Sequence, residues 1–168
     1  MVSSPEVSPP ETVTALPYSP PTRLSIPAIG VDAPFGELTL DASGALTAPP
    51  PEEENLVGWY RDGAAPGENG TAVVVGHVDT TTGPAVFLLL RKLAPGSTVD
   101  VTRADGVVAT FSVDAVRRYS KDQFPDQDVY GDSPDAQLRL ITCGGTYDKA
   151  RNDYTDNVVA FAHLVSSK

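Results

Sequence analysis

The sequence predicts an all-β domain whose strands close, or nearly close, into a barrel. Three observations support this prediction. The 168 residues include 16 prolines and 14 glycines, and few stretches show helical periodicity. Seven or eight short runs either alternate apolar with polar residues or consist largely of β-branched residues. Turn residues separate these runs at short intervals, as is typical of β-barrels and sandwiches.

Two segments are expected along the chain, a linker over residues 1–21 and a domain over residues 22–168. The linker is rich in Pro, Ser, Thr and Glu, so it has little apolar surface to bury and is predicted to be disordered or extended. At the start of the domain, residues 22–38 predict two short strands joined by a turn. Residues 40–70 predict a loop-dominated stretch, because three consecutive prolines exclude a central strand.

The remaining elements are predicted in chain order as a buried central strand, one or two helical turns, a hairpin and two apolar strands. They cover residues 71–78, 83–96, 97–121, 137–145 and 156–165. The hairpin turns at Asp105-Gly106, a dipeptide suited to tight β-turns. A polar loop over residues 146–156 is expected between the last two strands.

The charge and the metal-binding residue types limit the function. The formal net charge is −10, from 12 basic and 22 acidic residues. Nucleic acid is not expected as a partner, because phosphate binding needs Lys and Arg to displace counterions. One cysteine and two histidines make a four-ligand structural zinc site unexpected, and no other cofactor is expected. With no run of about 18 apolar residues and no signal-peptide pattern, we expect no membrane anchor within these residues.

The single cysteine, Cys143, follows the apolar run LRLIT and precedes two glycines. From these residues alone two interpretations stay open. A lone cysteine commonly packs in the core as a small apolar side chain. Alternatively, the end of a strand holds a nucleophilic thiol, and the glycines let a substrate carbonyl approach backbone N–H donors. On the second interpretation, Thr142, Gly144 and Gly145 are candidate substrate-binding residues.

His77 ends a second apolar run, AVVVGH, and strengthens the nucleophile interpretation. A histidine near a thiol can act as a base toward it and as an acid toward a leaving amine. Asp79 is a candidate for orienting the imidazole or binding substrate, with an exposed turn aspartate as the alternative. A purely structural role for His77 also stays open. His163 lies inside the last predicted strand, and we expect it to be structural.

A third catalytic group should stabilise the oxyanion of a tetrahedral intermediate. Arg151 lies eight residues after Cys143 in the predicted polar loop, Asn157 opens the last strand, and Arg139 lies four residues before Cys143. Arg151 is preferred, because an arginine on a loop can move to a carbonyl. Other chemistries lack support: there is no G-x-S-x-G motif, no phosphate-binding glycine motif after a strand, and no marked carboxylate pair.

Five stretches, taken in order, resemble the sortases of Gram-positive bacteria, and most closely the class F sortases of actinobacteria. They are VVVGHVD, GPAVFLLLRKL, FPDQDVYG, LRLITCGGTYD and YTDNVVAFA. LITC, Leu140 to Cys143, matches the TLxTC signature of sortases. The resemblance covers about Leu24 to Leu164, which is essentially the whole predicted domain.

The resemblance implies an eight-stranded sortase-type β-barrel with one or two short helices. It also implies a cysteine transpeptidase that cleaves an LPxTG-type C-terminal sorting signal between Thr and Gly. Cys143 would form a thioacyl-enzyme, and His77 would protonate the leaving amine and then deprotonate the incoming one. The implied partners are secreted proteins bearing the signal and a peptidoglycan precursor or other amine acceptor. The implied location is the extracellular face of the membrane, through an N-terminal anchor outside these residues, and we expect a monomer.

One departure from the family pattern concerns the third residue. Sortases carry a catalytic arginine near the start of the last strand, where the alignment of NVVAFA places Asn157. Arg151 is the nearest arginine, so it is the expected third residue, with Asn157 as the alternative. No stretch matches the calcium site of some class A sortases. Two other functions stay open: another Cys/His cell-wall peptidase, and a secreted β-barrel binding module with a structural cysteine.

Overall fold

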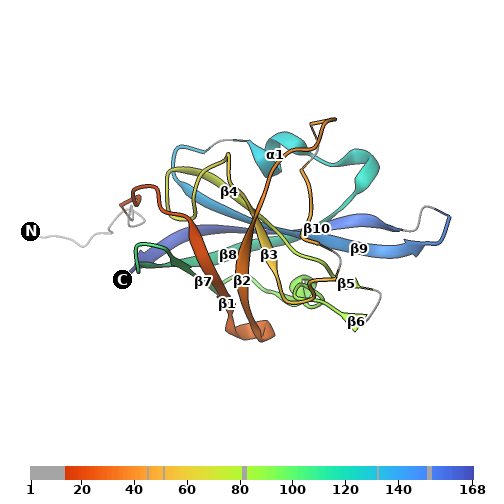
Figure 1. Cartoon of the computed structure of the whole chain (residues 1–168), viewed down its shortest axis with the longest axis horizontal. Helices are drawn as coiled ribbons and strands as arrows, with labels where there is room; N and C mark the ends of the chain where they lie inside the picture. The colour runs from red at the N-terminus through yellow and green to blue at the C-terminus, as the bar shows by residue number, and fades with distance from the viewer. Residues whose placement is uncertain (1–13, 45, 51, 81–82, 132, 151–152) are drawn as a thin grey trace, which may run out of the picture.

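The computed structural model describes residues 14–168 apart from 45, 51, 81–82, 132 and 151–152. The side chains of 143–148 and 153 also lie outside the description. Eight strands form a closed barrel in the order β1-β2-β3-β4-β9-β10-β8-β7 (Figure 1). Their bounds are β1 Pro21–Ile26, β2 Val31–Leu38, β3 Val57–Tyr60, β4 Gly70–Val75, β7 Thr98–Arg103, β8 Val108–Ser120, β9 Ala136–Asp148 and β10 Asp153–Ser167. The predicted all-β, eight-stranded barrel is therefore confirmed.

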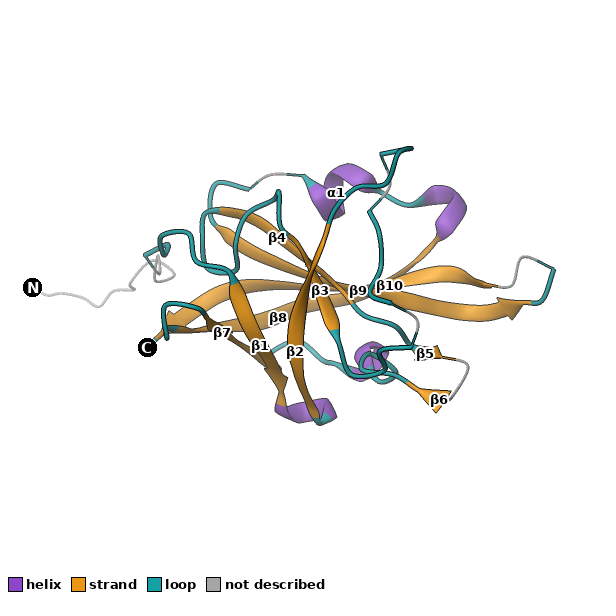
Figure 2. Ribbon diagram, in the orientation of Figure 1, coloured by secondary structure: helices purple, strands orange, loops and turns teal. Residues whose placement is uncertain are grey.

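The remaining elements are short (Figure 2). They are the small strands β5 Asp79–Thr80 and β6 Gly83–Pro84, the 3-10 turns η1 Pro27–Ile29, η2 Leu90–Lys92 and η3 Lys121–Gln123, and the helix α1 Asp126–Tyr130. β5 and β6 pair only with each other. Among the described residues no helix is long and apolar enough to cross a membrane.

Two of the eight barrel pairings are parallel, and the other six are antiparallel. β2 pairs with β3 in parallel, from Phe35↔Val57 to Leu38↔Tyr60. β4 pairs with β9 in parallel, from Gly70↔Ala136 to Val75↔Ile141. Since parallel neighbours cannot be joined by a tight turn, a long crossover separates their strands in the sequence. The whole hairpin of β7 and β8 is inserted between β4 and β9.

Strand alternation sends one set of side chains into the barrel. β7 has the burial pattern exposed-buried-intermediate-buried-intermediate-buried, and β8 begins with the same alternation. The interior residues of β9 and β10 are Leu138, Leu140, Val158, Ala160 and Ala162, each at most 4% exposed. At about 25 cal/mol per Å² of buried apolar surface, this interior is the main stabilising contribution to the fold.

Several predicted elements are confirmed, and others need correction. The strand pair over 22–38 and the hairpin at Asp105-Gly106 are both present, as β1–β2 and β7–β8. The helical turn predicted within 83–96 is present as the 3-10 turn η2, and the short strand β6 takes the first two residues of this stretch. Its buried residues Phe87, Leu90 and Leu93 recur every third position, which suits 3.0 residues per turn rather than 3.6.

The loop predicted over 40–70 contains a strand, β3, whose four residues are too few to give a clear pattern. The polar loop predicted over 146–156 is wrong for the most part, because β9 runs to Asp148 and β10 begins at Asp153. These strand ends pair with each other, Asp153 with Asp148 and Tyr154 with Tyr147. They extend beyond the barrel as a two-stranded ribbon (Figure 1).

A buried arginine ties the N-terminal segment to the barrel. Arg103 is 1% exposed and donates to the carbonyl oxygens of Pro66 at 3.1 Å and Pro17 at 2.9 Å. It also pairs with Asp105 at 2.6 Å. The N–H of Leu16 adds a bond of 2.9 Å to the Gly67 carbonyl. Residues 14–20 of the predicted linker therefore lie against the barrel, while residues 1–13 fall outside the description.

We expect Gly58→Ala to destabilise the barrel, because a Cβ at Gly58 would lie 2.5 Å from Cγ of the buried Leu38. Overpacking of this kind costs about 1–3 kcal/mol of unfolding free energy. Gly36 is the ladder partner of Gly58, and its Cβ would meet nothing closer than 3.5 Å, so Gly36→Ala is the matched control. Urea unfolding measures both. Equal losses in the two variants would contradict this account of the packing.

We expect Asp105 to contribute acid-sensitive stability. The hydrogen bond from Arg103, followed by that from the Val107 N–H, lowers the pKa of the Asp105 carboxyl from 3.8. A lowered folded-state pKa stabilises the fold above the unfolded-state pKa, and this contribution is lost as the pH falls through the folded-state value. Asp105→Asn should therefore unfold more easily at pH 7, and the difference from the original protein should shrink below pH 3.8. A difference that is constant with pH would refute the assignment.

Candidate active site

His77 is held where the chain leaves β4. The N–H of Gly76 donates to the Ile141 carbonyl at 3.1 Å, and the His77 carbonyl accepts from the Phe87 N–H at 3.0 Å. A Cβ at Gly76 would lie 2.6 Å from Cδ2 of Phe87, so only glycine fits before His77 without displacing the ring. The backbone of His77 is thus fixed from both sides.

The imidazole of His77 is half-buried, and its Nε2 lies 2.6 Å from the carbonyl oxygen of Pro49. A carbonyl oxygen only accepts hydrogen bonds, so Nε2 must carry the proton in this contact. When the ring is neutral, Nδ1 is then the unprotonated nitrogen. The bond therefore selects Nδ1 as the nitrogen that can take up and return a proton.

Cys143 lies inside β9 and not at its end, which corrects the sequence prediction. Its backbone pairs with Asn157 of β10, while the pairing of β9 with β4 stops at Ile141. At Cys143, β9 is therefore still paired with β10 but no longer with β4. His77 and Cys143 each follow the last β4–β9 pair, Val75↔Ile141, by two residues, so the same register continued that far would set them level with each other.

The next residues expected at the site are Thr142, Gly144, Gly145 and Arg151. Thr142 is 3% exposed, and its Oγ1 has no hydrogen-bond partner among the described residues. Gly144 follows Cys143 in β9 and pairs with Asp156. Gly145 is also within β9, so the two glycines continue a strand instead of ending one. Arg151 lies outside the described residues, and its assigned role stays a prediction.

Asp79 and His163 have partners of their own. Asp79 is exposed, and its Oδ2 accepts a 2.5 Å hydrogen bond from the Tyr154 hydroxyl. His163 lies six positions along β10 from Asn157, and its Nδ1 contacts Asp114 Oδ1 at 2.7 Å. The Pro49 carbonyl, rather than Asp79, is the partner recorded for the imidazole of His77.

Arg139 is a buried residue of β9, with 9% of its surface exposed. Its guanidinium donates to Gln137 Oε1 at 3.1 Å and lies 4.6 Å from the centre of the Phe161 ring. Burial lowers the pKa of this guanidinium, and the charge of Asp114 opposes that shift. These contacts make Arg139 part of the packing and leave it poorly placed to move to a substrate.

An apolar surface lies on the outer face of β4, β9 and β10, beside His77 and Asn157. Its buried members are Val73, Val129, Ile141 and Val159. Because the residues that alternate with them point into the barrel, this cluster forms on the outside, under the segment that carries α1. Tyr119, the ladder partner of Asn157, packs edge-on against Phe124 at 6.0 Å between ring centres.

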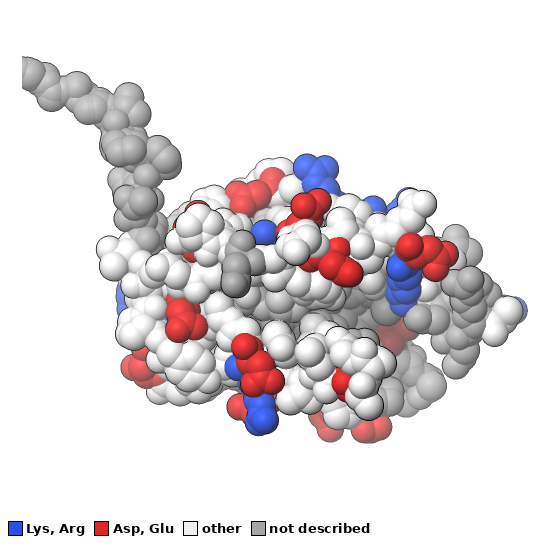
Figure 3. Space-filling view, turned by 90° about the horizontal axis from the view of Figure 1, so that it is seen from above, with Lys and Arg blue, Asp and Glu red and all other residues white. Residues whose placement is uncertain are grey.

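A cavity of about 730 Å³ opens beside this outer apolar surface. Leu40, Leu46, Tyr60, Val73 and Tyr130 line it, with the carboxylates of Asp62 and Asp126. The view from the α1 side shows acidic and basic groups interspersed, without a continuous basic patch (Figure 3). This side of the barrel therefore offers an apolar cavity next to β4, the strand that ends two residues before His77.

Sequence reasoning missed two contributors to this site. Pro49 holds His77 through a backbone carbonyl, which every residue possesses, so its identity carries no signal beyond a stiff run of prolines. Tyr154 falls in a stretch predicted as loop, but it lies in β10, pairs with Tyr147 of β9, and donates its hydroxyl hydrogen bond to Asp79.

Comparison with known proteins agrees with this geometry. The Sortase domain family matches residues 24–165. No curated protein matches the chain. A Clostridium perfringens Sortase D5 transpeptidase aligns with a TM-score of 0.63 at 23% identity, covering 88% of this chain and 79% of that one. Sortase A from Corynebacterium diphtheriae aligns at 0.65 and 21%, covering 89% and 62%. Sortase A of Listeria monocytogenes aligns at 0.66 and 15%, covering 90% of each chain.

We expect the two histidines to be opposite tautomers when neutral. His77 donates from Nε2 to a carbonyl, whereas His163 donates from Nδ1 to a carboxylate. Long-range proton–nitrogen NMR correlations above the titration range should therefore show an Nε2–H ring for His77 and an Nδ1–H ring for His163. An Nδ1–H ring at His77 would mean that Pro49 does not hold it in solution.

Proposed function

The chain belongs to the sortase family, whose members are cysteine transpeptidases, and on this premise we propose that it cleaves an LPxTG-like C-terminal sorting signal between Thr and Gly. The acyl fragment passes through a thioacyl-enzyme on Cys143 to an amine acceptor. The hydrolytic outcome of a cysteine peptidase arises when water takes the place of the amine. A secreted binding module with a structural cysteine loses support from the family match over residues 24–165.

The parallel pairing of β4 with β9 is the observation that carries this proposal. It ends at Val75↔Ile141, two residues before His77 on one strand and two before Cys143 on the other. Two residues 66 positions apart in sequence thus each follow the same strand pair by two positions, which supports a site in which they act together. A nucleophile and a base need this proximity.

In the first half-reaction, the sulfur of Cys143 attacks the threonine carbonyl carbon and the carbonyl π electrons move onto oxygen. Nδ1 of His77 takes the thiol proton and returns it to the glycine nitrogen as the C–N bond breaks. The Pro49 carbonyl, 2.6 Å from Nε2, holds the ring in the orientation and tautomer that this transfer needs. Its partial negative charge also stabilises the imidazolium that forms in between.

The third residue of the site is proposed from two candidates. Asn157 is the ladder partner of Cys143, so its backbone is fixed beside the nucleophile. Its amide N–H would donate to the oxyanion. Arg151, the residue preferred from the sequence, would supply a full positive charge from the segment between β9 and β10.

The sorting signal is proposed to lie in the apolar cavity beside Val73, Tyr60 and Tyr130. An extended peptide there would run along the outer face of β4 and β9 toward Cys143. The carboxylates of Asp62 and Asp126 line the same cavity, so they disfavour acidic residues in the peptide.

The cellular context is part of the same proposal. The partners are secreted proteins with a sorting signal and a peptidoglycan precursor or other cell-wall amine, and the location is the extracellular face of the membrane. The described N-terminal residues leave the barrel at the end away from the ribbon of β9 and β10 (Figure 1). An upstream anchor at that end would leave the site facing the wall. We also propose a class F, actinobacterial, monomeric enzyme, on the ordered motifs from VVVGHVD to YTDNVVAFA.

We expect the protein to form a thioacyl adduct on Cys143 when incubated with a sorting-signal peptide, and a ligation product when an amine is added. Mass spectrometry detects both. Cys143→Ala should give neither, and His77→Ala should lower kcat about 10²–10⁴-fold. His163→Ala is the matched control and should stay within about twofold, because His163 lies six positions along β10 from Asn157 and its imidazole is bound to Asp114. Absence of any adduct across varied LPxTG-like motifs would end the proposal.

We expect Asn157→Ala and Arg151→Ala to identify the oxyanion donor. Loss of one such donor typically lowers kcat about 10²–10³-fold with little change in KM. If Asn157 is the donor, only its variant shows this loss; if Arg151 is, the pattern reverses. Steady-state kinetics on the ligation reaction measures both. Near-original kcat in both variants would mean that neither side chain stabilises the oxyanion.

A further inference from the structure

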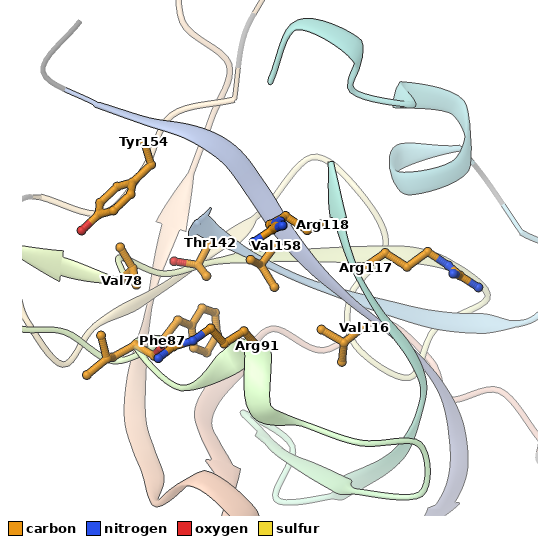
Figure 4. Close-up of a pocket in the computed structure, with 10 residues that line it drawn as sticks. Val78, Phe87, Arg91, Val116, Arg117, Arg118, Thr142, Tyr154 and Val158 are labelled. Carbon is orange, nitrogen blue, oxygen red and sulfur yellow. Dashed lines mark hydrogen bonds between the residues drawn. The ribbon is translucent and has the colours of Figure 1, made fainter. Parts of the chain in front are cut away.

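A second cavity, of about 570 Å³, opens on the other face of the strands that carry the proposed nucleophile. Arg118, Val158 and Thr142 are successive ladder partners across β8, β10 and β9, so they share one face, and all three line this cavity (Figure 4). The outer apolar surface uses the alternate residues, Ile141 and Val159. The two cavities share no lining residue among those described.

The walls of this second cavity are apolar and its rim is basic. Val78, Phe87, Val116 and Val158 contribute apolar surface. Arg91 from η2 and Arg118 from β8 contribute guanidinium groups, and no carboxylate is among the described lining residues. The chain as a whole has a net charge of −10, so two arginines on one cavity give this region a charge opposite to that of the chain.

Both guanidinium groups keep donors for a ligand. Each guanidinium has five N–H donors. Arg91 uses Nη1 on the Leu88 carbonyl at 2.5 Å. Arg118 places Nε 3.3 Å from Asp156 Oδ2, and its side chain remains 66% exposed. The nearby carboxylate of Asp79 is bound by the Tyr154 hydroxyl at the same rim.

Arg117 also borders the cavity, yet its side chain points away from it (Figure 4). Strand alternation explains this, since Arg117 pairs with Val159 on the outer face whereas Arg118 pairs with Val158. Arg117 therefore has the same charge as Arg118 and lies on the same strand, but its side chain points to the outer face of the barrel.

A buried hydroxyl lies at the inner end of the cavity. Thr142 is 3% exposed, and its Oγ1 has no partner among the described residues. In Figure 4 this oxygen points toward Val78 and Tyr154, across the cavity. A buried hydroxyl without a partner is unfavourable, so a bound molecule that accepts or donates here would be favoured. Thr142 directly precedes Cys143 in β9, and the described β4–β9 pairing has ended by this point, so such a molecule would lie beside the backbone of the nucleophile at this end of the barrel.

We propose that this cavity binds the amine acceptor of the second half-reaction, and that the acceptor carries a carboxylate or phosphate held by Arg91 and Arg118. The proposal rests on the transpeptidase function proposed above. The acceptor nitrogen attacks the thioacyl carbonyl carbon and loses a proton to Nδ1 of His77. The C–N bond forms, the C–S bond breaks, and the sulfur of Cys143 leaves with the electron pair and recovers the proton. Entry from this face lets the acyl peptide stay in the outer groove.

The test compares acceptors that differ in charge, using thioacyl-enzyme formed with one fixed sorting-signal peptide. Glycine is paired with glycinamide, and 2-aminoethyl phosphate with ethanolamine, each corrected for its fraction of free amine. At least one anionic acceptor should show a KM at least tenfold below its neutral counterpart. Which pair shows the difference distinguishes a carboxylate from a phosphate. Equal KM values within both pairs would overturn the proposal.

Three variants test which arginine causes the preference for an anionic acceptor. Arg91→Gln and Arg118→Gln should each reduce the preference for the anionic acceptor about tenfold, and Arg117→Gln should keep it. The rate of thioacyl formation from the peptide should stay within about twofold in all three. A loss of preference in Arg117→Gln equal to that in Arg118→Gln would mean general surface charge and would refute a defined site.

A binding experiment distinguishes failure of the acceptor-site inference from failure of the proposed transpeptidase function. Cys143→Ala cannot form a thioacyl group but keeps the cavity, so NMR titration with 2-aminoethyl phosphate or glycine should shift the amides of Thr142 and Arg91. Adding Arg91→Gln and Arg118→Gln to this variant should raise Kd at least tenfold. Absence of a thioacyl-enzyme alongside specific binding would reject the transpeptidase alone. A thioacyl-enzyme alongside no binding and no charge preference would reject the acceptor site alone.

Discussion

The parallel pairing between β4 and β9 is the constraint on which the rest of the site depends. Backbone hydrogen bonds from Gly70↔Ala136 to Val75↔Ile141 fix the register of two strands that are far apart in sequence. A one-residue slip would exchange the inward and outward faces of β9 and expose Leu138 and Leu140, so the buried core enforces this register. Core packing therefore fixes the register of the two strands from which His77 and Cys143 follow, each two residues after the last pair.

The two cavities are lined by different strands, the first by Val73 of β4 and the second by Thr142 of β9 and Val158 of β10. Alternate residues of β9 and β10 face the interior of the barrel and the outer apolar surface in turn. Ile141 belongs to the outer face and Thr142 to the inner one. A reaction with two successive substrates gains from this arrangement, because each substrate can be bound by its own face and the two need not compete for one groove.

The sequence was informative where local chemistry and burial agree. The Asp105-Gly106 turn and the alternation of β7 and β8 are visible as patterns, because each alternate side chain enters the core. The apolar runs that end near His77 and Cys143 are visible for the same reason. The extension of β9 beyond Cys143 was not, since GGTYD and DYTD are polar and lack the apolar alternation that marks the other strands. The contact between His77 and Pro49 depends on a backbone carbonyl and tertiary approach, and it has no local signature.

The Arg103 cluster has a mechanical consequence. β1 is hydrogen-bonded to β2 on one side and to β7 on the other, and both neighbours are antiparallel to it. A force on the N-terminal segment along β1 would load both ladders in shear, so many hydrogen bonds resist at once instead of opening one after another. Arg103, bound to Pro17 ahead of the strand, would take the load before either ladder does. The barrel would in this way resist extraction from its N-terminal side, at the end away from the reacting groups.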